Sequence, residues 1–400
     1  MLILYYILLL GLSIYSYSLI DLNLTMINHP LWNWFRGQII NIGYFQRELS
    51  WWIYFAIICL LFIFYFLIIK QGKKISPVRL AIIIGGILLI SYPFLSHDFF
   101  NYMFDAKILT FYGKNPYLFK ALDFPSDHWT RFMHWTHRTY PYGPTFLPLT
   151  LIPSFLGMGK FLLTFILFKL MYVAFYIFAV KSLEKINKQL ALIIATHPII
   201  IIEGLVNGHN DALALFIAII AFGFLYSKPR NHELTLGAFS QSIRDKYPFI
   251  SGFIPMAFWL RGKKNWIARF LFLFSGGIKY ITLPLVLISQ KSKIVNWIVI
   301  TLISCLLLYL SFKSEIQPWY FLVFFSLIPI FGNLISRIEP LLFGLLLSYY
   351  PYIRLGGWDT IGKVSLKKEI ILFALVINIF YLIFYYLKFT YVKKRRKSQN

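Results

Sequence analysis

Cysteine and acidic residues are scarce in this sequence. Cys59 and Cys305 are its two cysteines, and both stand inside apolar runs, so the chain has neither a disulfide framework nor a cysteine metal site. Only 14% of the residues are charged, whereas 59% are hydrophobic and the mean hydropathy is +0.68. A soluble domain of 400 residues needs far more charged surface. The composition therefore excludes an ordinary soluble domain.

Long apolar runs are abundant instead. Runs of about 20 apolar residues match the thickness of the bilayer core, and the first run lacks the basic start and cleavage site of a signal peptide, so we expect it to be a retained span. We predict one all-α domain over residues 1–400, a polytopic helix bundle of about 10–13 spans that include short or re-entrant helices. The clearest runs are Leu2–Ile20, Trp51–Ile69, Val78–Leu95, Phe161–Val180, Ala212–Tyr226, Ile294–Leu310 and Ile370–Leu387.

Lys and Arg number 39 against 15 acidic residues, which gives a net charge of +24. Such a charge could indicate nucleic-acid binding, but the basic residues gather at the ends of the apolar runs. That distribution follows the positive-inside rule, so we predict a multi-pass protein of the cell membrane and no nucleic-acid partner. The clusters are Lys70–Arg79, Lys181–Lys188, Lys228–Arg230, Arg261–Lys264, Lys291–Lys293 and Lys393–Lys397.

With each basic cluster in the cytosol, the long polar segment 97–143 becomes an outer loop with interfacial helices, and 227–248 a cytosolic polar segment that could carry another interfacial helix. Trp266–Ser289 is too short for two full spans, so we expect two short helices that meet near Lys279 on the outer side. Thr145–Leu156, with two prolines, is expected to be a kinked or re-entrant piece.

Asp98 and Asp105 are the carboxylates of greatest interest in the outer loop. They are seven residues apart, two helical turns, and therefore share one helix face with Tyr102. Asp98 follows directly after an apolar run, which places its carboxylate at the depth of a lipid headgroup. It could act there in chemistry or simply cap the helix, and we favour chemistry. The helix itself is aromatic and is expected to lie in the membrane interface.

The rest of the loop is basic and aromatic. His134 and His137 have no nearby carboxylate motif, so their spacing is weak support for a metal site, and none is assigned. Arg138 is the best candidate for a phosphate contact. Tyr140 and Tyr142 could line a sugar site or serve as interfacial aromatic residues.

Polar groups outside the loop are predicted to converge on the same outer face. Glu203 stands in an apolar segment, where an ionisable group costs about 2.5–3.5 kcal/mol on insertion scales and needs a partner or a function. Lys279 is expected on the outer side, whereas the positive-inside rule places basic residues in the cytosol. We therefore expect Lys279 to pair with a phosphate or with Glu203. The other groups are Asn207, His209, Asn210 and Asp211, which suit sugar hydroxyls, and the pair Trp319 and Tyr320.

The order of these motifs resembles a known group. Gly113–Tyr117 (Gly-Lys-Asn-Pro-Tyr), Tyr140–Pro144 (Tyr-Pro-Tyr-Gly-Pro), Asn207–Asp211 (Asn-Gly-His-Asn-Asp), the Ile-Lys-Tyr at Lys279 and Pro318–Tyr320 follow one another. This set is similar to the GT-C superfamily of integral-membrane glycosyltransferases, above all the polyprenol-phosphate-mannose-dependent α-mannosyltransferases, with PIG-M-like enzymes as more distant kin. The resemblance covers roughly residues 90–320.

The resemblance implies an inverting transfer of a hexose, mannose as the first choice, from a polyprenyl-phosphate donor to a glycan or lipid-linked acceptor on the non-cytosolic face. It gives the role of catalytic base to Asp98, with Asp105 as the alternative. The strict Asp-x-Asp signature of the superfamily is absent, because the sequence reads Ser96-His97-Asp98, and Mg²⁺ or Mn²⁺ is left open as a cofactor. The expected binding residues are His97, Tyr102, Arg138, Tyr140, Tyr142, Glu203, Asn207, His209, Asn210, Asp211, Lys279, Trp319 and Tyr320.

Two other classes compete with a transferase. A lipid flippase or secondary transporter would explain ionisable groups inside spans, but we find no internal repeat of the kind that transporters show. A scaffold subunit without chemistry would tolerate substitution of Asp98, Asp105 and Asp211.

Overall fold

The computed structural model describes residues 1–226 and 263–397, and within these ranges it contains helices and no strands. The expected all-α fold is confirmed, whereas the predicted cytosolic segment 227–248 lies outside the described residues. The helices are α1 (Leu2–Tyr15), η1 (Ser16–Leu19), α2 (Pro30–Ile40), η2 (Asn41–Phe45), α3 (Arg47–Lys70), η3 (Gly72–Lys74), α4 (Pro77–Leu88), α5 (Asp98–Thr110), η4 (Ala121–Asp123), η5 (His128–Phe132), α6 (Phe146–Leu156), α7 (Phe161–Glu184), α8 (Lys188–Thr196), η6 (Ile200–Val206), α9 (Asn210–Leu225), α12 (Lys263–Ile278), η8 (Tyr280–Leu287), α13 (Lys293–Lys313), η9 (Pro318–Phe321), α14 (Leu322–Phe325), α15 (Ile328–Ile335), α16 (Glu339–Leu347), α17 (Tyr350–Leu355) and α18 (Ile361–Lys397).

Five helical segments of the described chain are long and apolar enough to cross a membrane, and the number rises to seven if each of two bent pairs is one span. A 24-residue helix such as α3 or α7 is about 36 Å long, enough for the hydrocarbon core. Three shorter apolar helices, α4, α6 and α9, stand beside them. The lower end of the expected range of spans is therefore reached only when these short helices are counted.

The bent spans break at prolines. The α8–η6 pair bends by 65° across His197 and Pro198, and the α15–α16 pair bends by 82° just before Pro340. Proline lacks the amide hydrogen that would continue a helix, and it disfavours helical geometry in the residue before it. The first break precedes η6, and η6 leads directly into the Asn207–Asp211 turn.

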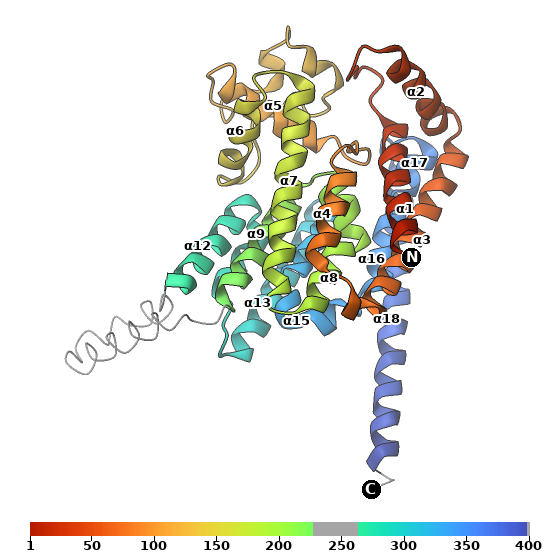
Figure 1. The fold of residues 1–400 in the computed structure, drawn as a ribbon, viewed down its shortest axis with the longest axis vertical. Coiled ribbons are helices and arrows are strands. Elements are labelled where there is room, and N and C mark those ends of the chain that lie inside the picture. The colour runs from red at the N-terminus through yellow and green to blue at the C-terminus, as the bar shows by residue number, and fades with distance from the viewer. Residues whose placement is uncertain (227–262, 398–400) are drawn as a thin grey trace, which may run out of the picture.

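Helix α9 lies at the centre of the bundle and packs against α7 and α12 (Figure 1). Its first ten residues are all buried, as expected of a helix that is apolar all round. The predicted break in Trp266–Ser289 is present, because α12 ends at Ile278 and the 3₁₀ helix η8 begins at Tyr280, with Lys279 between them.

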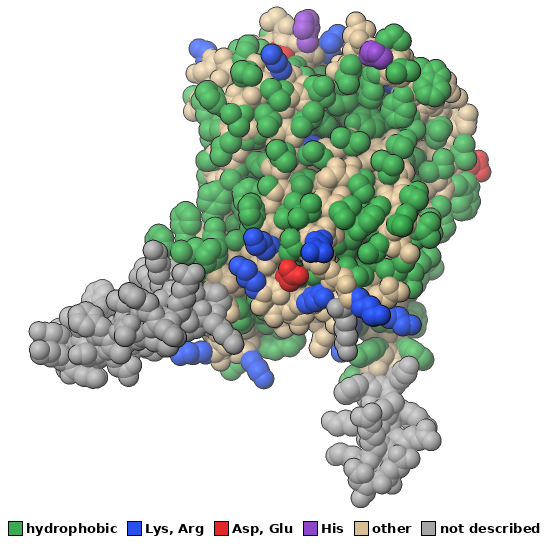
Figure 2. Space-filling view, viewed as in Figure 1, with side chains coloured by type: hydrophobic (Ala, Val, Ile, Leu, Met, Phe, Trp, Pro, Cys, Tyr) green, Lys and Arg blue, Asp and Glu red, His purple; other side chains and the backbone are tan. Residues whose placement is uncertain are grey.

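The segment 97–143 forms the end of the molecule that carries α5 and α6, and α2 lies at the same end (Figure 1). On the face that Figure 2 shows, hydrophobic side chains cover the middle, and most Lys and Arg gather toward the opposite end. This arrangement agrees with an outer end at α5 and a cytosolic end at the basic side chains.

Helix α5 differs from the interfacial helix that was expected. Every residue from Phe99 to Ile108 is buried against protein, so no face of this stretch is left for lipid. The reason is the surrounding loop and the start of α7, whose aromatic residues pack on α5: Phe100 contacts Phe132 of the loop and Phe161 of α7, and Phe104 contacts Trp129. The loop and helix together make a compact cap.

Candidate functional site

Four helix ends bring the predicted polar residues together. These are the start of α5, the turn before α6, the turn between η6 and α9, and the break between α12 and η8. Helix ends leave backbone groups without partners inside the helix, so they suit polar sites within an apolar bundle. At one of these joins, Gly143 touches the end of α12 so closely that a Cβ would lie 2.0 Å from the Gly277 carbonyl oxygen, and the Thr145 amide donates to that oxygen at 3.2 Å.

Asp98 is the first residue of α5, and its carboxylate is about one-fifth exposed. His97 is the N-cap residue and makes no side-chain capping hydrogen bond, whereas Ser96 Oγ accepts from the Asp98 amide at 3.3 Å, so the Asp98 carboxylate is not the cap. Arg138 Nη2 lies 3.7 Å from one carboxylate oxygen, and His209 Nδ1 lies 3.9 Å from the other. Burial raises the pKa of Asp98 above its ordinary value, while Arg138 and Lys279 counteract part of this rise.

Asp105 lies two turns further along α5 and is 7% exposed. Burial raises its pKa to about 8; Arg138 counteracts the rise and Asp98 adds to it. A pKa near 8 favours the protonated form of Asp105 at neutral pH. We therefore favour Asp98 over Asp105 as the candidate base.

Arg138 and Tyr142 form the second part of the cluster. Arg138 Nη2 donates to the Tyr142 hydroxyl at 3.0 Å, and the ring of Tyr142 meets that of Tyr102 edge to face at 4.8 Å. Tyr140 is used differently: it is buried, and its hydroxyl donates to the Gly143 carbonyl at 3.3 Å, so it holds the turn.

The Asn207–Asp211 turn is packed tightly under Asp98. Asn207 Nδ2 donates to Glu203 Oε2 at 3.0 Å, and the Leu95 amide donates to the other end of the Asn207 side chain at 3.2 Å. Gly208 adopts φ +66°, and a Cβ there would lie 2.6 Å from the Phe99 ring, so only glycine fits.

Glu203 is fully buried, and His209 Nε2 lies 3.4 Å from its carboxylate. The same histidine has its other ring nitrogen near Asp98, and its ring stacks on Trp319 at 3.9 Å with an interplanar angle of 15°. His209 thus connects the buried acid, the candidate base and an aromatic platform. The backbone amide of Asn210 donates to the Tyr102 hydroxyl at 3.5 Å.

Lys279 pairs with Asp211 rather than with Glu203, which corrects one of the two partners expected from sequence. Its Nζ lies 2.8 Å from Asp211 Oδ2 and 5.2 Å from the centre of the Tyr320 ring. The reason is the α12–η8 break, which brings Lys279 to the first turn of α9, where Asp211 lies.

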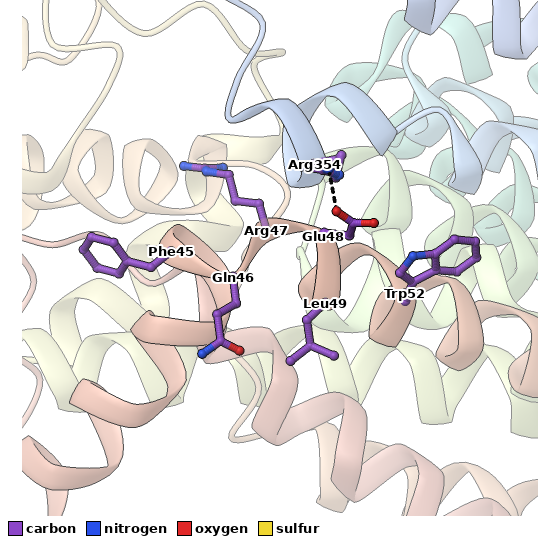
Figure 3. A pocket seen from close by; sticks show the side chains of 7 residues that line it. All are labelled: Phe45, Gln46, Arg47, Glu48, Leu49, Trp52 and Arg354. Carbon is purple, nitrogen blue, oxygen red and sulfur yellow. Dashed lines mark hydrogen bonds and ion pairs between the residues drawn. The ribbon is translucent and has the colours of Figure 1, made fainter.

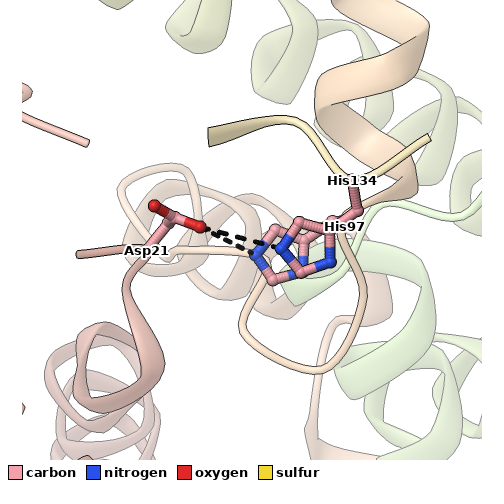
Figure 4. Close-up of side chains that lie close together, drawn as sticks. All are labelled: Asp21, His97 and His134. Carbon is pink, nitrogen blue, oxygen red and sulfur yellow. Dashed lines mark ion pairs between the residues drawn. The ribbon is translucent and has the colours of Figure 1, made fainter. Parts of the chain in front are cut away.

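His97 does not join Asp98, although it is next to it in sequence. Its Nε2 turns toward Asp21, which follows η1, and its ring stacks on His134 (Figure 4). The predicted binding residues are therefore brought together except for His97, which faces a separate cluster. Tyr140 packs on Tyr142 with ring centres 5.3 Å apart, and its hydroxyl holds the turn.

Sequence reasoning missed Lys169, a fully buried cation in the middle of α7. Its Nζ donates to Ser91 Oγ at 2.9 Å, to the Val206 carbonyl at 3.0 Å and to the Leu205 carbonyl. It thus satisfies carbonyls at the end of η6, directly before the Asn207–Asp211 turn. Lys169 could have been found from the sequence, because a single lysine inside an apolar span needs a buried partner or a function.

A separate hollow of about 710 Å³ lies between the start of α3 and the end of α17 (Figure 3). Its acid, Glu48, is paired with Arg354 at 2.8 Å, and no candidate site residue lines it. The lining residues are Phe45, Gln46, Arg47, Glu48, Leu49, Trp52 and Arg354.

The Asp98 cluster offers a partly exposed carboxylate that can take a proton, two cations within reach of an anion, and aromatic faces. Such a set suits the attack of a hydroxyl group at a centre that bears an anionic leaving group.

A family model described as "Alpha-(1->6)-mannopyranosyltransferase, N-terminal domain" matches residues 36–286 of the chain. No curated protein and no solved structure gives a significant match.

Proposed function

Because the chain belongs to the α-(1→6)-mannopyranosyltransferase family of GT-C membrane enzymes, which use a polyprenol-phosphate-mannose donor, we propose that it performs this transfer with Asp98 as its base. The observation that carries the proposal is the convergence of Asp98, Arg138, His209, Asp211 and Lys279 from four segments that are far apart in sequence. The matched range includes all five residues.

In the proposed reaction, Asp98 takes the proton from the acceptor hydroxyl as its oxygen attacks the anomeric carbon. The bond from that carbon to the donor phosphate breaks, and the lipid phosphate leaves. A phosphate leaves readily, so a strong general acid is not required. A base positioned in this way contributes a factor of about 10²–10⁴ to the rate.

Arg138 and Lys279 supply positive charge for the departing phosphate. Arg138 already lies 3.7 Å from Asp98, and Lys279 is held by Asp211 at 2.8 Å. Fixed charges in a site of low dielectric stabilise developing charge strongly. Trp319 and Tyr142 would present ring faces to the sugar, with the buried Tyr102 packed against Tyr142, and Asn207 and Asn210 would fix the turn that holds His209.

Direct displacement inverts the anomeric centre. An α-linked product then requires a β-linked donor, which makes the stereochemistry a check on the mechanism. The acceptor is proposed to be a glycan or lipid-linked saccharide on the non-cytosolic face of the cell membrane. The position of the site at the end opposite most basic side chains supports this orientation (Figure 2).

The test is transfer in proteoliposomes that contain the purified chain, labelled polyprenyl-phosphate mannose and a mannoside acceptor. We expect an α-(1→6)-linked product from the wild type, and none above background from Asp98→Asn. Asp123→Asn is the matched control, because Asp123 is an exposed carboxylate of the same outer segment, and it should retain full activity. Movement of the donor across the bilayer without formation of product would contradict the proposal and favour a flippase.

A further inference from the structure

Three side chains from separate segments meet beside the start of α5: Asp21, which follows η1, His97 and His134 (Figure 4). One ligand atom from each lies within 4.8 Å of the other two. His97 Nε2 is 3.9 Å from Asp21 Oδ2, and His134 Nε2 is 3.7 Å from the same oxygen. The three donors thus face one another across a common point.

The contacts inside this cluster are too long for hydrogen bonds, which join nitrogen and oxygen at about 2.7–3.2 Å. His97 is 9% exposed, and its Nε2 is buried with no hydrogen-bond partner among the described residues. A buried nitrogen without a partner is costly, so its direction toward Asp21 calls for a ligand.

Asp21 is fixed so that one carboxylate oxygen remains available. Its Oδ1 accepts from the Asn23 amide at 2.8 Å, and its own amide donates to the Tyr92 hydroxyl at 3.2 Å. Oδ2 is therefore the oxygen that faces the two rings. This arrangement presents one carboxylate and two imidazoles, the ligand set of catalytic zinc sites with two histidines and one carboxylate.

We propose that Asp21, His97 and His134 bind one divalent transition-metal ion of the zinc type. Bonds of about 2.0–2.2 Å to nitrogen and oxygen place tetrahedral ligands about 3.4 Å apart, a few tenths of an ångström less than the 3.7 and 3.9 Å from Asp21 Oδ2 to the two ring nitrogens. Mg²⁺ and Mn²⁺ prefer oxygen ligands, so this site is distinct in chemistry from the Mg²⁺ or Mn²⁺ cofactor left open by the sequence.

Binding requires one ring to turn. The rings of His97 and His134 are stacked at 3.6 Å with an interplanar angle of 13°, whereas a metal must lie in the plane of each ring that binds it. His134 is the ring that can move, because its side chain is half exposed, while His97 is enclosed. A water molecule would take the fourth position.

The ion would tie the segment after η1 to the outer loop, and through His97 it would hold the first turn of α5. Since Asp98 follows His97, the metal would position the proposed base without touching the substrate. This last step rests on the proposed function, whereas metal binding itself does not.

The test uses the full chain, purified in detergent without a polyhistidine tag, stripped with a chelator and then titrated with Zn²⁺. Bound metal is measured by elemental analysis, affinity by calorimetry, and the melting midpoint with and without Zn²⁺. We expect about one Zn²⁺ per chain, a higher midpoint with Zn²⁺, and at least tenfold weaker binding in Asp21→Asn, His97→Ala and His134→Ala.

His137→Ala is the matched control, because His137 is an exposed histidine three residues from His134 and outside the cluster. Its zinc content should equal that of the wild type. The half-exposed His134 can be replaced without disturbing the core, so a folding defect in His97→Ala does not weaken the test. Equal zinc binding by wild type and His134→Ala would overturn the proposal, as would a preference for Mg²⁺ over Zn²⁺. Transfer activity is not part of this readout, so the site can fail while the proposed function stands, and the reverse.

Discussion

Removal of the Lys279 ammonium should reduce both stability and transfer, for two different reasons. Lys279 Nζ is 2.8 Å from Asp211 Oδ2, and the Asp211 side chain is only 3% exposed. Lys279→Met therefore leaves a buried carboxylate without its partner. The loss of one partner of a buried pair costs about 3–5 kcal/mol, and because the lysine side chain is itself one-quarter exposed, we expect about 3 kcal/mol.

The double variant Asp211→Asn/Lys279→Met separates the two effects. It no longer contains an unpaired buried charge, so we expect its stability to return to within about 1 kcal/mol of the wild type. Transfer should stay about 10²–10³-fold low in both variants, because a preorganised charge at the leaving group is worth about 2.7–4 kcal/mol.

The assays are denaturant titration in detergent micelles and transfer from labelled polyprenyl-phosphate mannose. Lys363→Met is the control, because Lys363 pairs with the exposed Asp359 at 2.6 Å and its loss should change neither quantity. Recovery of transfer in the double variant would refute the role of Lys279 at the phosphate. An unchanged stability of Lys279→Met would refute the buried pair.

Substitutions at three further residues test other parts of the site. Asp105→Asn should remove a pH dependence of stability. Burial raises the folded-state pKa of Asp105 to about 8, above its unfolded value, so the free energy of unfolding of the wild type falls as pH rises from about 4 to 8, by at most about 1.4 kcal/mol per pH unit. Melting midpoints at pH 6 and pH 9 will show whether the variant loses this slope. Lys169→Met should lower the midpoint by several degrees, because it leaves the Leu205 and Val206 carbonyls without a donor, and an unchanged midpoint would contradict that role. Trp319→Ala should raise the KM for the donor several-fold, because the stack on His209 is lost, whereas Trp319→Phe should retain most of it; equal effects of the two variants would exclude stacking.

Much of the fold could be predicted from the sequence, because membrane insertion imposes simple rules. Apolar runs gave α3, α7, α13 and α18, and the break at Lys279 followed from a segment too short for two spans. The burial of α5 could not be predicted in this way, since it depends on two aromatic side chains that are distant in sequence, Phe132 in the loop and Phe161 at the start of α7.

The sequence indicated which residues belong to the candidate site, but it could not indicate which of them contact one another. Asp98, His209 and Lys279 were recognisable as polar groups that apolar surroundings do not favour. Which acid pairs with Lys279 depends on the angle at the α12–η8 break, so Asp211 could not be chosen over Glu203. Likewise, Asp21 is separated from His134 by more than a hundred residues, and no spacing rule connects them.

The most direct test of the account compares Asp98→Asn with Asp105→Asn in single-turnover transfer, with donor binding measured separately. The two residues lie on one helix face, but Asp98 is about one-fifth exposed with Arg138 Nη2 at 3.7 Å, whereas Asp105 is 7% exposed and burial raises its pKa to about 8. We predict that Asp98→Asn binds the donor with unchanged affinity and transfers about 10²–10⁴-fold more slowly, and that Asp105→Asn stays within several-fold of the wild type. Near-normal transfer by a folded Asp98→Asn chain would contradict the account.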